Sequence, residues 1–160
     1  MSIWFNLLFL LVHNKNVSIN APEGYRDVSG ETAKAAKLDP GTVIALQKGE
    51  TGTPAAASIN LVIGEHHPED KLDDAKQCAA FATEMGTRQN ASSTTAEVVD
   101  APTGKTCQIT FTFKTADAKV VSTILRGRKT TWVMTCAMRT ANTAAVKECK
   151  QALATVKLAP

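Results

Sequence analysis

Residues 105–138 read KTCQITFTFKTADAKVVSTILRGRKTTWVMTCAM. This stretch contains three runs in which apolar and polar side chains alternate, and short polar segments separate them. Alternation with a period of two is typical of strands that bury one face. Connections this short join antiparallel neighbours, because parallel strands need a crossover of a dozen or more residues. The stretch therefore predicts an antiparallel meander with strands near 105–114, 119–125 and 130–138.

The flanking sequence predicts further strands and one exposed loop. Alternation or short apolar runs bounded by Gly and Pro mark strands near residues 17–21, 42–47 and 56–63, and a further strand near 96–100 precedes the meander. The polar residues 87–95 between them predict an exposed loop.

Two amphipathic helices are expected. The first begins near Pro68, which suits a first helical turn, and its apolar residues recur every three or four positions until Gly86. The second is capped by Asn142 and runs to about residue 156. Strands and helices in this order predict an α+β fold in which helices flank a central antiparallel β-sheet. No repeat or linker divides residues 17–160, so we expect one domain there.

Residues 1–16 differ from the rest of the chain. Ile3–Val12 is an apolar run interrupted by Asn6, and it is too short for a membrane-spanning helix of about 20 residues. Its length fits the apolar region of a secretory signal peptide, although no basic residue precedes it and no clear cleavage site follows. We expect an export signal, with a helix packed on the domain as the alternative. Contact with a membrane is expected only through this segment.

Four cysteines, Cys78, Cys107, Cys136 and Cys149, are widely spaced, and none forms a CxxC pair that would favour a zinc site. Cys136 falls on the last predicted strand and Cys149 on the apolar side of the last predicted helix, which folds back over that strand. We therefore predict the pair Cys136–Cys149 and, by elimination, Cys78–Cys107. The alternative is four buried thiols. Paired cysteines would place the protein in an oxidising compartment, periplasmic or secreted.

The charge of the chain does not favour nucleic acid as a partner. The formal net charge is +3, without the dense basic stripe that nucleic-acid binders usually carry. The one basic cluster, Arg126, Arg128 and Lys129, falls at a predicted hairpin tip. A solvated turn explains it, and it is a candidate for surface contact with a partner.

One polar segment could support chemistry. Glu65, His66, His67 and Glu69 offer two imidazoles and two carboxylates, which suit Zn²⁺ or Mn²⁺. Adjacent side chains on an extended chain point to opposite sides, so the histidines converge only if the chain turns there. A polar turn between strand and helix is the favoured interpretation. Neither a serine nucleophile motif nor a phosphate loop is present, and we predict no catalytic residues and no cofactor.

Three phrases resemble the PsbP-like superfamily, which includes the photosystem subunit PsbP, Ran-release factors and DcrB-type envelope proteins. They are the opening strand and turn at Val17–Tyr25, the strand segment Thr131–Cys136 and the helical segment Cys149–Leu153. The resemblance implies a central antiparallel sheet between helices, an α/β/α sandwich, and mostly non-enzymatic roles in binding or assembly. It specifies no active site.

These observations lead to two functional expectations. The first is a non-enzymatic secreted or periplasmic binding and assembly protein that contacts another protein, for example as an accessory or immunity protein of a secretion system. Its contact points would be the loops at 49–55 and 87–95 and the basic hairpin tip. The second is a metal-binding protein or metal-dependent enzyme centred on His66 and His67.

Overall fold

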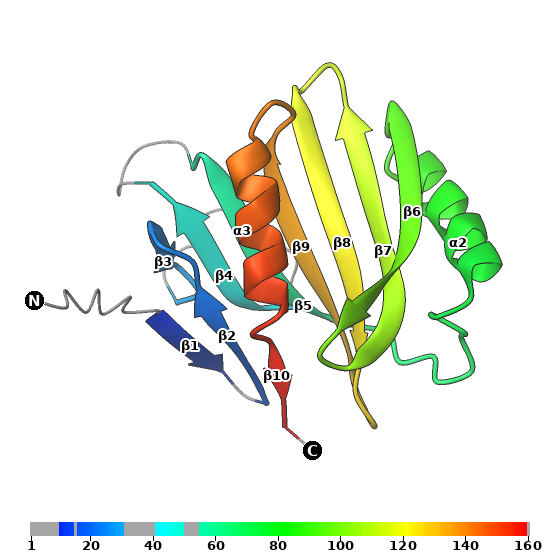
Figure 1. Ribbon diagram of the computed structural model, residues 1–160, viewed down its shortest axis with the longest axis horizontal. Coiled ribbons are helices and arrows are strands. Elements are labelled where there is room, and N and C mark those ends of the chain that lie inside the picture. The colour runs from blue at the N-terminus through cyan, green and yellow to red at the C-terminus, as the bar shows by residue number, and fades with distance from the viewer. Residues whose placement is uncertain (1–9, 15, 31–40, 50–54, 160) are drawn as a thin grey trace, which may run out of the picture.

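A seven-stranded antiparallel sheet forms the centre of the protein (Figure 1). The computed structural model describes residues 10–14, 16–30, 41–49 and 55–159. The expected meander forms one half of the sheet, because its three strands pair with their sequence neighbours. In spatial order the strands are β3 (Tyr25–Asp27), β4 (Thr42–Lys48), β5 (Ala57–Gly64), β9 (Thr131–Arg139), β8 (Ala118–Arg126), β7 (Gly104–Phe113) and β6 (Ser93–Ala101).

A second, three-stranded sheet contacts the main sheet at strands β3 and β4. It consists of β1 (Leu10–Asn14), β2 (Val17–Ala21) and β10 (Lys157–Leu158), with β2 in the middle. Val17 and Ile19 of β2 belong to the main hydrophobic core. The sequence predicted neither β1 nor β10. Residues 1–9 lie outside the described residues, so the export signal stays a prediction.

Two described helices, α2 (Ala75–Arg88) and α3 (Thr143–Leu153), lie on opposite faces of the main sheet. Their first turns are capped by side chains: Asp74 accepts a hydrogen bond from the amide of Gln77, and Asn142 accepts one from the amide of Ala145. In Figure 1, α3 crosses in front of β9 and β5, and α2 lies beyond β6 at the far end of the sheet.

Both predicted cysteine pairs are the pairs found. Cys136 on β9 is bonded to Cys149 on α3, and Cys78 on α2 is bonded to Cys107 on β7. In the register of β7, β8 and β9, Cys136 and Cys107 point to opposite faces of the sheet, which fixes one helix on each face. The pairs indicate an oxidising, extracytoplasmic compartment.

The hydrophobic core is divided between the two faces. The larger cluster lies between α3, the small sheet and strands β4, β5, β8 and β9, and includes Leu46, Ile59, Leu61, Leu125 and Trp132. The smaller cluster contains five buried residues beneath α2, namely Cys78, Ala82, Cys107, Ile109 and Phe111. The two faces are therefore covered to very different extents.

The predicted fold class is confirmed in its coarse form, an antiparallel sheet with helices on both faces. A three-stranded sheet shares one face with α3, and α2 packs mainly on β6 and β7 on the other. The expected loop at 87–95 was placed wrongly at both ends. Helix α2 continues past Gly86 to Arg88, and β6 already begins at Ser93.

Candidate functional site

An apolar groove with a volume of about 980 Å³ runs over the part of the main sheet that α2 leaves uncovered. Its floor is formed by β8, β9 and β5, and α2 forms one wall. It is lined by Phe81, one of the large hydrophobic side chains that are exposed among the described residues, at 40%, and by the half-buried Val62, Ile124 and Val133. Exposed apolar surface concentrated in one groove marks a place where another molecule binds.

The floor of the groove consists of cross-strand rows set by the sheet register. One row is apolar, because Val62 on β5 lies opposite Val133 on β9, which lies opposite Ile124 on β8. The next row is polar and joins Ser122 to Thr135, whose hydroxyl oxygens are 3.5 Å apart. A further polar row, Gly64, Thr131 and Arg126, lies on the other side of the apolar row, so apolar and polar rows alternate along the floor.

The wall formed by α2 carries the exposed aromatic ring of the groove. Phe81 and Met85 line it from the helix, and Phe111 and Phe113 line it from β7 below. The ring centroids of Phe111 and Phe113 are 6.5 Å apart. Phe111 is buried and Phe81 is 40% exposed, so this wall of the groove extends from the core on β7 to solvent on α2.

The loop between β5 and α2 forms one end of the groove and is tied to the β8–β9 hairpin. One guanidinium nitrogen of Arg126 donates hydrogen bonds to the carbonyl oxygens of His67, at 3.0 Å, and Asp70, at 2.6 Å. The Nδ1 atom of His66 lies 3.0 Å from the hydroxyl oxygen of Thr131 on β9. Arg126 and His66 thus fix the position of this end of the groove.

The histidines and carboxylates of this loop do not gather into a metal site. The Nε2 atom of His67 lies 3.0 Å from a carboxylate oxygen of Glu65, and its Nδ1 atom lies 3.2 Å from one of Glu69, whereas His66 turns to Thr131. Within the described ranges, no three His, Cys, Asp or Glu side chains are placed to hold a metal ion.

The contacts of His67 predict a pH dependence of the loop. Hydrogen bonds that the imidazolium donates to the carboxylates of Glu65 and then Glu69 raise the pKa of His67 above its usual 6.5. Because folding raises the pKa of His67, the contact stabilises the loop fully below about pH 6.5. This stabilisation is lost as the pH rises through the pKa that His67 has in the folded protein. We expect an NMR titration to give a pKa above 6.5 for His67 and a lower one in the Glu65→Gln/Glu69→Gln variant. Equal values would contradict the role of the two carboxylates.

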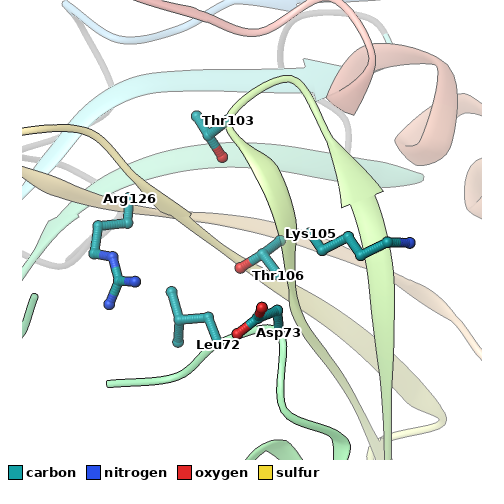
Figure 2. A pocket seen from close by; sticks show the side chains of 6 residues that line it. All are labelled: Leu72, Asp73, Thr103, Lys105, Thr106 and Arg126. Carbon is teal, nitrogen blue, oxygen red and sulfur yellow. The ribbon is translucent and has the colours of Figure 1, made fainter. Parts of the chain in front are cut away.

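A smaller polar pocket of about 200 Å³ adjoins the groove at Arg126, which lines both (Figure 2). Three of its polar side chains, those of Lys105, Thr106 and Arg126, already have partners. The hydroxyl of Thr106 donates to the carbonyl oxygen of Ile124, and the ammonium of Lys105 lies 3.0 Å from Asp100 and points away from the pocket in Figure 2. We therefore regard this small pocket as an extension of the groove at its Arg126 end.

The predicted contact residues fall in different environments. Arg126 lines the groove, whereas Arg128 and Lys129 are exposed in the turn beyond it. Residues 50–54 of the expected contact loop at 49–55 lie outside the described residues. Arg88 and Gln89, from the expected loop at 87–95, line the groove near the end of α2.

The sequence interpretation missed the groove itself. Its lining comes from six elements, and most of its apolar residues resemble ordinary core positions. Phe81 was the available signal, because this aromatic residue lies outside the apolar stripe of α2 and yet is not polar.

Comparison with known proteins supports the fold alone. No family model and no curated protein matches the chain. Among solved structures, cyanobacterial PsbP (CyanoP) from Synechocystis sp. PCC 6803 aligns over 99% of this chain and 98% of its own, with a TM-score of 0.53 and 10% identity. A point variant of the protein Mog1 aligns over 92% and 96%, with a TM-score of 0.50 and 16% identity. The resemblance to the PsbP-like superfamily is therefore confirmed for the fold.

No helix among the described residues is long and apolar enough to cross a membrane.

Proposed function

We propose that this chain, which has the PsbP-like fold, is a non-enzymatic binding or assembly protein that acts in the periplasm or after secretion. The observation that carries the proposal is the apolar groove over β8, β9 and β5. Sheet faces are normally buried against another layer, and among the described residues this strip is flanked by α2 along one side. A partner protein would supply the missing layer.

Two features of the groove support binding of another molecule. Its end is fixed by Arg126 and by the contact of His66 with Thr131, so the cavity keeps a defined boundary. Its wall is fixed by the Cys78–Cys107 disulfide, which joins α2 to β7. A rigid apolar surface loses little conformational entropy on binding, which favours affinity.

An accessory or immunity role in a secretion system is one form that such binding could take. The metal-binding alternative has less support, because the described contacts engage His66 and His67 with different partners.

The proposal predicts that crosslinking to a partner depends on position. We would place a photoreactive benzoylphenylalanine at Phe81, in the groove, or at Leu11 on β1, which is 63% exposed and is not among the residues that line the groove. Irradiation of cells that produce the protein should give a discrete crosslinked species from position 81 only. Equal crosslinking at both positions, or none at position 81, would contradict binding through the groove.

A further inference from the structure

We infer that the occupant of the groove is an amphipathic helix of a partner protein, which lies beside α2 on strands β8, β9 and β5. This inference rests on the proposed function and names the chemistry of its partner. It follows from the width of the uncovered strip, from the hydrogen bonding of its strands and from the rows of side chains in its floor.

The uncovered strip has the width of a single helix. Three strands spaced about 4.8 Å apart span about 14 Å. A helix with its side chains is about 10–12 Å across. On β8 the lining of the groove runs from Val120 to Arg126, about 23 Å of strand, which is enough for about four helical turns. One helix fits next to α2, where it would cover Phe81.

The strands of the floor exclude an extended peptide as a good ligand. Strand β9 pairs with β5 on one side and with β8 on the other, and β8 pairs with β7, so their backbone groups are already used. A peptide laid flat on this face would leave its own backbone groups without partners. A helix satisfies its backbone internally and presents only side chains.

The polar row in the floor distinguishes a helix from a hydrocarbon chain. An acyl chain along the groove would cover the hydroxyls of Ser122 and Thr135, which would then lose water and keep only their long contact of 3.5 Å with each other. A helix can place apolar residues over Val62, Val133 and Ile124 and a Ser, Thr or Ala over the hydroxyls. The partner should therefore carry an apolar stripe at i, i+3, i+4 and i+7 that a small or polar residue interrupts.

The area of the strip argues against a second copy of this chain. A strip about 14 Å by 23 Å offers about 300 Å². A stable protein interface buries about 800 Å² on each partner. A face-to-face dimer through this strip would be too small, whereas one face of a helical segment matches it.

The test uses a synthetic lactam-stapled peptide of about 14 residues, or ~20 Å of helix. Its Leu residues form a stripe with one central Ser, and Gln and Lys fill the other positions. NMR spectra of the isotope-labelled full chain should show saturable shifts on β8, β9, β5 and the groove side of α2. Phe81→Glu and Ala80→Glu should each weaken binding at least about tenfold, whereas Leu11→Glu should leave it unchanged.

Two further probes separate the alternatives: a peptide of the same composition with the stripe scrambled, and palmitate. If the scrambled peptide binds equally well, or palmitate binds and the striped peptide does not, the helix is overturned while binding through the groove stands. If light scattering shows a dimer that Phe81→Glu dissociates, a second copy replaces the helix. If no probe shifts the groove residues at millimolar concentration, the helix inference fails, and the crosslinking at position 81 then decides the proposed function separately.

Discussion

We expect the Cys78→Ala/Cys107→Ala variant to lose about 3–4 kcal/mol of its free energy of unfolding. The disulfide closes a loop with a sequence separation of 29 residues, which restricts the unfolded chain more than a short loop does. Urea unfolding measures the loss. The matched variant Cys136→Ala/Cys149→Ala removes a loop with a separation of 13 residues and should lose about 3 kcal/mol.

The two variants should differ more in where the structure loosens than in total stability. Helix α2 has three buried residues, Cys78, Ala82 and Gly86, and the core beneath it is small. Helix α3 packs into the larger cluster through four buried residues, among them Cys149 and Leu153. Hydrogen exchange should therefore rise selectively in α2 when its disulfide is removed. A loss below about 1 kcal/mol without faster exchange in α2 would show that packing alone holds this helix.

Alternation predicted the main sheet because one face of most strands is buried. Phe111 and Trp132 lie in strands whose every second residue faces a core, so a period of two is visible in the sequence. Strand β1 was missed because the residues from Leu7 to Val12 are all apolar and show no alternation. Strand β10 has two residues, which is too short for any period to appear.

Helix boundaries and the groove could not be predicted for a different reason. Gly86 predicted the end of α2, but the helix continues because this glycine permits close packing on β6. A sequence does not distinguish these two uses of glycine. The groove depends on which strands a helix leaves uncovered, and this follows from the sheet order, in which β9 lies between β5 and β8. The disulfides were predictable because each joins residues on facing layers.

Replacing Gly86 by valine should cost about 3 kcal/mol of the free energy of unfolding, because a side chain there overpacks the contact between α2 and β6. A Cβ atom at position 86 would overlap the hydroxyl of Thr94 and lie only 3.0 Å from its Cβ atom. Away from such a contact, valine is a better helix former than glycine, so the sign of the effect is set by packing. Thermal and urea unfolding of the purified variant measure the loss.

A double-mutant cycle tests whether Thr94 is the cause. In the Gly86→Val background, Thr94→Ala removes the overlapping hydroxyl and should restore about 1 kcal/mol or more. The control Ala79→Val places the same side chain at an exposed position of α2 and should cost only about 0.6 kcal/mol. If Gly86→Val is no worse than this control, the helix can move away from β6. The wall of the groove would then be adjustable, and its width would no longer select a single helix.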